Sequence, residues 1–95
     1  MKTAIFPGSF DPFTKGHEAI VKQAFALFDK MIIAIGENIG KNSLLTPQER
    51  KRLIEKLYSN NERVEVVTYS TLTGDLARKV GASAIIRGVR NTIDF

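Results

Sequence analysis

The chain of 95 residues lacks cysteine, long hydrophobic runs and the usual nucleotide-binding motifs. Without cysteine, disulfide bonds, thiolate catalysis and zinc–thiolate sites are excluded. No stretch approaches the roughly 20 apolar residues that cross a bilayer, and the first apolar run, residues 4–6, is too short for a signal peptide. We therefore expect a cytoplasmic protein with no membrane partner. Neither GxGxxG nor GxxxxGK(S/T) occurs, which excludes a standard dinucleotide site and a P-loop.

The composition is that of an ordinary globular domain with a small excess of positive charge. Hydrophobic residues make up 43% and charged residues 25% of the chain, so residues 1–95 are predicted to form a single domain. The net charge is +4, from 14 basic and 10 acidic side chains, which gives a weak preference for anionic ligands. Because aromatic residues do not interleave with the basic ones, we expect no nucleic-acid partner.

Apolar runs and amphipathic segments alternate along the chain. Continuous apolar runs predict strands, and apolar residues spaced by 3.6 predict helices. The predicted strands are residues 3–6, 31–35, 64–68 and 82–86, and the predicted helices are residues 16–28, 47–58 and 72–80. This β-α-β-α-β-α-β order predicts an α/β fold: a Rossmann-like, doubly wound parallel sheet with strand order 3-2-1-4.

The two predicted edge strands differ in polarity. Glu65 lies inside the third strand, as suits an edge position, whereas the fourth strand is wholly apolar. We expect either a fifth strand, missing from this chain at its C-terminus, or a partner chain to cover the fourth strand.

The sequence indicates where the predicted helices begin or end and which of their residues face the sheet. Thr46 is expected to cap the second helix in a capping box with Glu49, with Pro47 at the first helical position, and Gly81 is expected to end the third. The residues predicted to face inward are Ile20, Val21, Ala24, Leu27 and Phe28 in the first helix, and Leu53, Ile54 and Leu57 in the second.

The segment from Pro7 to His17 connects the first strand to the first helix. A turn rich in glycine and proline at this place is where α/β proteins bind phosphates. His17, the single histidine, lies on the first helical turn and on its inner face. This setting favours a ligand-binding histidine over one that only packs. Ser9 could hydrogen-bond a phosphate or simply form the turn.

Further basic residues fall at the same edge of the predicted sheet, where ligands of parallel sheets bind. Lys41 follows the second strand, although alone it could be a solvated lysine. Arg50 lies on the inner face of its helix and so needs a partner, either a ligand or a carboxylate such as Asp11. Arg87 and Arg90 follow the fourth strand and could grip two phosphate groups.

The turn motif resembles that of the nucleotidyltransferase superfamily, whose signature HxGH or TxGH follows the first strand. Here it reads Thr14-Lys15-Gly16-His17, after Pro7-Gly8-Ser9-Phe10-Asp11-Pro12. The later stretch Ile86-Arg87-Gly88-Val89-Arg90, with Asp94-Phe95, narrows the resemblance to the bacterial phosphopantetheine adenylyltransferases. It covers the whole chain, and because members of that family continue past this point, it implies a C-terminally truncated nucleotidyltransferase domain.

That resemblance implies transfer of an adenylyl group from ATP to 4′-phosphopantetheine, giving dephospho-coenzyme A and pyrophosphate in coenzyme A synthesis. It also implies Mg²⁺ as the ion, coenzyme A as a further ligand, and a homo-hexamer. His17 would contact the ATP phosphates and stabilise the transition state. By the same resemblance, ATP would be bound by Ser9, Phe10, His17, Gly88, Val89 and Arg90, and the pantetheine substrate by Ser9, Lys41, Thr73 and Arg87. No residue is assigned to a metal.

Two other interpretations stay open. The chain could be another small-molecule nucleotidyltransferase, acting as a cytidylyltransferase or as a nicotinamide-mononucleotide adenylyltransferase. It could also be a non-catalytic fragment that binds a phosphate ligand or assembles through the bare edge of its fourth strand.

Overall fold

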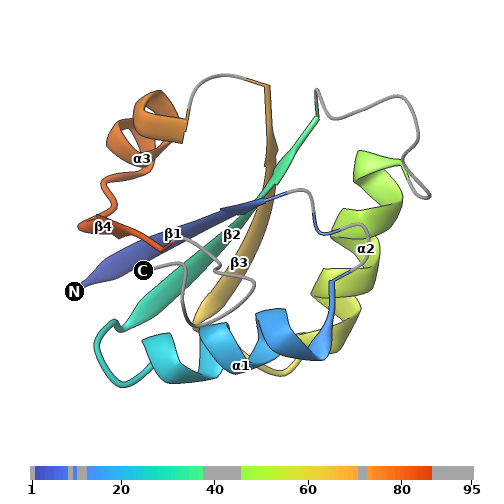
Figure 1. Cartoon of the computed structure of the whole chain (residues 1–95), viewed down its shortest axis with the longest axis horizontal. Helices are drawn as coiled ribbons and strands as arrows, with labels where there is room; N and C mark the ends of the chain where they lie inside the picture. Colours follow the sequence, from blue (N-terminus) through green and yellow to red (C-terminus); the bar gives the residue numbers. More distant parts are fainter. Residues whose placement is uncertain (1, 9, 11–12, 38–45, 71–72, 87–95) are drawn as a thin grey trace.

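Strands and helices alternate in the computed structural model, which describes residues 2–8, 10, 13–37, 46–70 and 73–86 (Figure 1). The elements are β1 (Thr3–Gly8), α1 (Lys15–Ala24), β2 (Lys30–Gly36), α2 (Pro47–Leu57), β3 (Val64–Tyr69), α3 (Thr73–Val80) and β4 (Ala84–Ile85). All strand pairs are parallel, and their order across the sheet is β3-β2-β1-β4. The predicted α/β fold and strand order are therefore confirmed.

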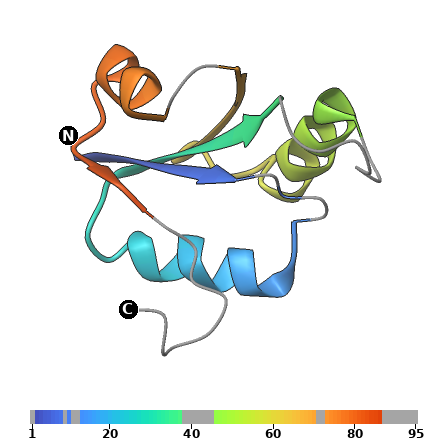
Figure 2. The same ribbon diagram turned by 45° about the horizontal axis from the view of Figure 1, so that its top comes forward.

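Helices cover both faces of the sheet (Figure 2). α1 and α2 pack on one face, and α3 packs on the other. Because side chains alternate along a strand, Phe6 joins the core under α1 and α2, while Ile5 joins the core under α3. The buried members of the larger core are Ala4, Phe6, Phe10, Val21, Ala24, Met31, Ile33, Ile35, Ile54 and Val66.

The strand register brings the carboxyl ends of the three longer strands to one edge of the sheet. Gly8 at the end of β1 pairs with Ile35 of β2, and Gly36 at the end of β2 pairs with Tyr69 at the end of β3. α1, α2 and α3 each follow one of these strands along the chain. The starts of the helices, where backbone N–H groups are unpaired, are thus gathered on one side of the molecule.

Three residues predicted to face inward do not. Leu27 is 69% exposed, because α1 ends at Ala24 and the helical spacing stops before it. Leu53 and Leu57 are 54% and 49% exposed, because a single row of α2, Arg50 and Ile54, packs onto the sheet. Leu53 and Leu57 lie on the flank of that row.

The predicted helix signals at α2 and α3 are confirmed. The Thr46 hydroxyl accepts from the Glu49 N–H at 3.1 Å, and Glu49 Oε1 accepts from the Thr46 N–H at 2.8 Å. This backbone hydrogen bond lowers the pKa of the Glu49 carboxyl, since it stabilises the charged form. Gly81 ends α3 with a φ of 72°, a conformation that costs glycine little.

The edge strands also follow the prediction in part. On β3, the carboxylate of Glu65 lies 2.8 Å from the Lys30 ammonium, at the surface of the sheet. At the opposite edge, β4 is shorter than predicted, Ala84–Ile85, and Ile85 is 39% exposed. The described part of β4 therefore presents an apolar side chain to solvent.

Arg63 ties the C-terminal end of α1 to the starts of β2 and β3. Its Nε donates to the Asp29 carbonyl at 2.9 Å, and its Nη2 donates to the carbonyls of Phe25 and Phe28 at 3.0 and 2.7 Å. The guanidinium also lies 4.3 Å from the centre of the Phe25 ring. A cation placed on carbonyls after a helix satisfies acceptors that the helix leaves unpaired.

We expect Arg63→Ala to lower the free energy of unfolding by about 1–2 kcal/mol, because charged hydrogen bonds contribute at this scale and the side chain is exposed. Urea denaturation measures the change. Arg63→Lys keeps the charge but lacks the planar fork, so it should lose most of the same stability. A wild-type midpoint for Arg63→Lys would show that charge alone accounts for the effect.

Candidate functional site

The turn after β1 is shaped by Phe10, which adopts a φ of 51° and is only 3% exposed. Positive φ is uncommon for a bulky residue and is held here by packing. The Phe10 ring meets Phe6 edge-on, with ring centres 5.1 Å apart. It also lies against Gly8, where an added Cβ would come within 3.0 Å of the Phe10 ring. The absence of a side chain at Gly8 leaves room for the Phe10 ring at the end of β1.

His17 closes the N-terminus of α1 by a capping box. Thr14 is the N-cap, and its hydroxyl accepts from the His17 N–H at 3.4 Å. In return, the backbone N–H of Thr14 donates to Nδ1 of His17 at 2.9 Å. The usual residue at this third helical position is Glu or Gln, and here an imidazole takes its place.

This hydrogen bond determines which nitrogen of His17 carries the proton. A backbone N–H can only donate, so Nδ1 must be the acceptor, and in the neutral ring the proton lies on Nε2. Thr14 Oγ1, 3.1 Å from the same nitrogen, can donate to it as well. The imidazole is therefore a neutral N–H donor whose other nitrogen is anchored to the backbone.

Three phenylalanine rings surround the imidazole of His17. Phe10 meets it edge-on at 5.0 Å, Phe13 lies at 5.2 Å with its plane tilted by 32°, and Phe6 lies at 6.1 Å. Burial lowers the pKa of His17 below its usual value of 6.5, because desolvation disfavours the charged ring. At neutral pH the neutral form predominates.

The lowered pKa of His17 makes folding stability depend on pH. The unfolded chain takes up a proton near pH 6.5, whereas the folded chain does so only at lower pH. The stabilisation is therefore complete above pH 6.5 and is lost as the pH falls through the folded pKa.

We expect the free energy of unfolding, measured by urea denaturation at pH steps below 7, to fall in the wild-type protein. His17→Gln should remove the His17 part of that slope, because glutamine keeps a capping box but does not titrate. Equal slopes for the two proteins would contradict the lowered pKa.

Arg50 lies on the inner face of α2, as predicted, and is only 2% exposed. Its Nε donates to the backbone carbonyl of Thr46 at 3.3 Å, so part of its hydrogen-bonding need is met inside the first turn of α2. The expected alternative partner, Asp11, lies outside the described residues. Among the residues that the structure describes, no buried side-chain nitrogen or oxygen lacks a hydrogen-bond partner.

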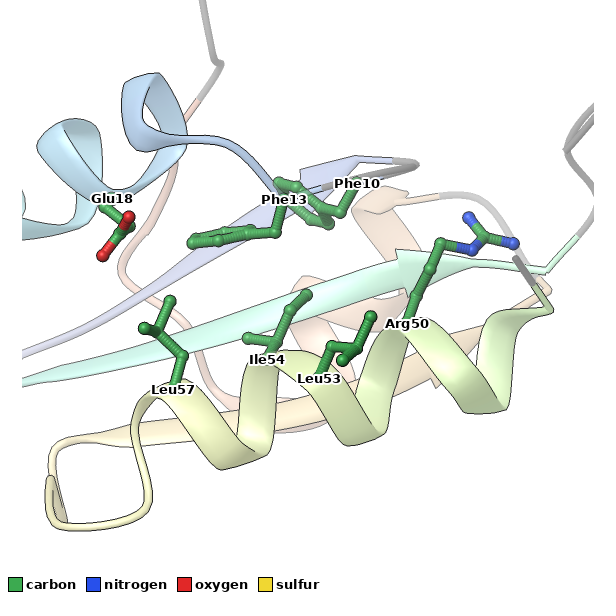
Figure 3. Close-up of a pocket in the computed structure, with 7 residues that line it drawn as sticks. All are labelled: Phe10, Phe13, Glu18, Arg50, Leu53, Ile54 and Leu57. Atoms are coloured by element: carbon green, nitrogen blue, oxygen red, sulfur yellow. The ribbon is translucent and has the colours of Figure 1, made fainter. Parts of the chain in front are cut away.

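A cavity of about 290 Å³ lies between α2 and the start of α1 (Figure 3). Leu53, Ile54 and Leu57 point into it from α2, and the Phe13 ring faces them. The guanidinium of Arg50 lies at one end of this group and Glu18 at the other. The full lining is Phe10, Phe13, Glu18, Arg50, Leu53, Ile54 and Leu57.

Tyr58 stands next to this cavity, at the C-cap of α2. Its ring meets Phe13 edge-on, with centres 6.0 Å apart. Burial, together with the negative charge of Glu18, raises the pKa of Tyr58 to about 12. The phenol is therefore protonated and uncharged at neutral pH.

Of the site residues predicted from the sequence, the structure brings Phe10 and His17 into contact. Thr73 begins α3 at the carboxyl side of β3, and its side chain is not described. The remaining predicted site residues lie outside the described residues: Ser9, Lys41, Arg87, Gly88, Val89 and Arg90.

Sequence reasoning missed Phe13, Tyr58 and the capping role of Thr14. The spacing of Thr14 and His17 matches a capping box and could have shown the third. No regular spacing links Phe13, which lies in the turn, to Tyr58, which lies 45 positions later in the printed sequence. Only the fold brings these two rings together.

The described ranges contain neither a membrane-spanning helix nor a cluster of metal-binding side chains. No helix there is long and apolar enough to cross a membrane. Nor do three or more His, Asp or Glu side chains gather in those ranges closely enough to hold a metal ion.

Curated relatives support the resemblance drawn from the motifs. The phosphopantetheine adenylyltransferase of Flavobacterium johnsoniae is 52% identical over 95 residues, which are 100% of this chain and 62% of that protein. The enzyme of the same name from Flavobacterium psychrophilum is 48% identical over 100% of this chain and 63% of its own length. The chain thus spans less than two thirds of the relatives it matches.

The fold is shared with solved nucleotidyltransferases. A bifunctional NMN adenylyltransferase/ADP-ribose pyrophosphatase from Francisella tularensis, solved with AMP and a manganese ion, matches with a TM-score of 0.68 and 20% identity. The match covers 90% of this chain and 31% of that one. At this identity the likeness concerns the fold alone. The family model described as cytidylyltransferase-like matches residues 5–95, and the chain belongs to that family.

Proposed function

We propose that the chain carries part of the active site of a phosphopantetheine adenylyltransferase, which transfers the adenylyl group of ATP to 4′-phosphopantetheine. One observation carries the proposal: an imidazole anchored by Nδ1 presents a neutral Nε2–H donor at the start of α1, beside the carboxyl ends of the strands. The high identity to enzymes of that name supports the choice of substrates.

The chemistry suits a site of this kind. The attacking group is a phosphate monoester, which is already largely anionic at pH 7, so no general base is needed. Catalysis then consists of aligning two anions and stabilising the charge that develops on the α-phosphate and the departing pyrophosphate. The Nε2–H of His17 and the N-terminus of α1 both favour negative charge.

The other residues keep the roles that the resemblance implies. Ser9, Gly88, Val89 and Arg90 would bind ATP, and Lys41, Thr73 and Arg87 would bind the pantetheine substrate, with Ser9 reaching its phosphate. Because the Phe10 ring is buried, its contact with ATP would come from the backbone.

Mg²⁺ would be held mainly by the ATP phosphates and water, because this ion uses few protein ligands. The described ranges contain no group of three or more His, Asp or Glu that could hold the ion by itself. When bound, the ion would neutralise phosphate charge. Three further predictions are untested: that the protein is located in the cytoplasm, that it forms a homo-hexamer, and that it binds coenzyme A.

Gly16 supplies a further argument for a ligand at the start of α1. Glycine inside a helix costs about 0.5–1 kcal/mol relative to alanine. An added Cβ at Gly16 would meet only Thr14 Oγ1, at an ordinary 3.6 Å. Packing of the described residues therefore gives no reason for glycine, whereas close approach of a phosphate would.

Gly16→Ala should therefore raise the free energy of unfolding by at most about 0.5–1 kcal/mol, the figure for a helix interior, because Gly16 is the second residue of α1. It should also weaken ATP binding severalfold. Urea denaturation and isothermal titration measure the two effects. Lys15→Ala, one position earlier on the same turn, is the control for a change in helix propensity. Unchanged ATP affinity in Gly16→Ala would remove this argument.

The test of the proposed function is pyrophosphate release in the presence of ATP, Mg²⁺ and 4′-phosphopantetheine. Release should require both substrates and fall about a hundredfold or more in His17→Ala, the scale for losing one transition-state donor. Glu49→Ala is the matched control, because it removes the equivalent capping side chain from α2. It should lower stability similarly and leave turnover unchanged.

A panel of substrates separates the alternatives. Release that depends on CTP, or on nicotinamide mononucleotide in place of 4′-phosphopantetheine, would replace the proposed substrates with those of the other nucleotidyltransferases. Binding of 4′-phosphopantetheine with no release from any pair would favour the non-catalytic fragment.

A further inference from the structure

We propose that Phe13 is a positioning residue for His17, and that Tyr58 holds Phe13 in place from the far end of α2. Phe13 would touch neither substrate and would act by fixing the plane of the imidazole. The kinetic part of this inference rests on the proposed function, whereas its spectroscopic part does not.

One hydrogen bond does not fix an imidazole. The bond from the Thr14 N–H holds Nδ1 of His17 at one point, but the ring could still tilt about that point. Phe13, at 5.2 Å and tilted by 32°, lies closest to parallel with the imidazole. Phe10 meets the ring edge-on at 5.0 Å and 84°. Together the two rings restrict the plane of His17 and so the direction of its Nε2–H.

Phe10 and Phe13 are held in different ways. Phe10 is 3% exposed and packed between Phe6 and Gly8. Phe13 is only half-buried, and it borders the cavity of about 290 Å³. Close packing therefore does not confine Phe13 on its cavity side.

The contact that limits Phe13 comes from Tyr58. The Tyr58 ring meets Phe13 edge-on at 6.0 Å and 83°, an arrangement that favours aromatic pairs beyond their buried area. Tyr58 itself is tied to α2, since its N–H donates to the Ile54 carbonyl at 3.1 Å. A chain of three rings, Tyr58, Phe13 and His17, thus connects the end of α2 to the start of α1.

The cavity leaves room for a conservative substitution of Phe13. Figure 3 shows the Phe13 ring reaching over Ile54 toward the space between Glu18 and Leu57. A hydroxyl added in Phe13→Tyr would enter that space, so this variant keeps the ring against His17. Phe13→Leu keeps the apolar volume but removes the flat face, and Phe13→Ala removes both.

Phe28 provides the matched control. It is a half-buried phenylalanine that packs on the same core, and it lies beyond the last turn of α1, at the other end from His17. Phe28→Ala and Phe13→Ala remove the same atoms. Their melting temperatures show how much of any effect is general loss of packing.

Two readouts test the proposal on the full chain: the pKa of His17 from its ring protons by NMR, and kcat and KM for ATP in pyrophosphate release. In Phe13→Ala we expect the pKa to rise toward 6.5 and kcat to fall about tenfold, as for a small misplacement of a reacting group. KM for ATP should stay within about twofold. Phe13→Leu should lower kcat in the same way, and Phe13→Tyr should match the wild type in both readouts.

The proposal is overturned if Phe13→Leu, or a folded Phe13→Ala, keeps the wild-type pKa and kcat and loses only melting temperature, as Phe28→Ala should. It is also overturned if Phe13→Tyr behaves like Phe13→Ala. If the wild-type protein releases no pyrophosphate, the proposed function fails. In that case the pKa of His17 shows only whether Phe13 shields the ring from water. Nuclear Overhauser contacts between the His17 and Phe10 rings, kept in Phe28→Ala and weakened in Phe13→Ala, then decide whether Phe13 positions the imidazole.

Discussion

The hydrogen bond from the Thr14 N–H to Nδ1 of His17 is the interaction on which the candidate site depends. It satisfies a donor that the start of α1 would otherwise leave unpaired. The same bond places the imidazole proton on Nε2. The hydrogen bond that caps the helix also orients the imidazole, so a change that frays the first turn of α1 should also disturb the Nε2–H donor.

α1 and α2 begin in the same way, but His17 supplies α1 with a hydrogen-bond donor that α2 lacks at the equivalent position. Both helices start with a threonine N-cap whose partner lies three residues later, Glu49 in α2 and His17 in α1. Glu49 meets the capping need as a carboxylate, which accepts only. His17 meets the same need and keeps a donor on its other nitrogen. Capping alone would be served by Glu, and this supports the proposal that the imidazole also acts on a ligand.

The architecture, and part of the site, could be predicted from the sequence. The alternation of apolar runs and amphipathic segments predicted a parallel sheet, and the doubly wound architecture gave its strand order. The spacing of Arg50 and Ile54 correctly placed both on the inner face. Helical spacing does not show how much of a helix surface packs against the sheet. Leu53 and Leu57 were therefore predicted to face inward, although they lie beside the buried row of α2 and are exposed. Leu27 was misplaced because the end of α1 has no clear stop signal.

The turn between β1 and α1 was harder to predict than the elements it joins. Phe10 has an unusual positive φ for its residue type, held by contacts with Phe6 and Gly8. Phe13 meets Tyr58, the residue that caps the C-terminus of α2. Such contacts depend on the packing of elements that are far apart in the sequence, so local residue preferences cannot predict them. The sequence nonetheless singled out His17, because its motif and its place at a helix start agree; its role in catalysis stays a prediction.

The most direct measurement is a long-range proton–nitrogen NMR spectrum of the imidazole above pH 7. It is unambiguous because the chain has 1 histidine. The account predicts a single neutral tautomer with the proton on Nε2 and a lone pair on Nδ1. A proton on Nδ1, or a mixture of the two tautomers, would contradict the anchored donor on which the site and its proposed chemistry rest.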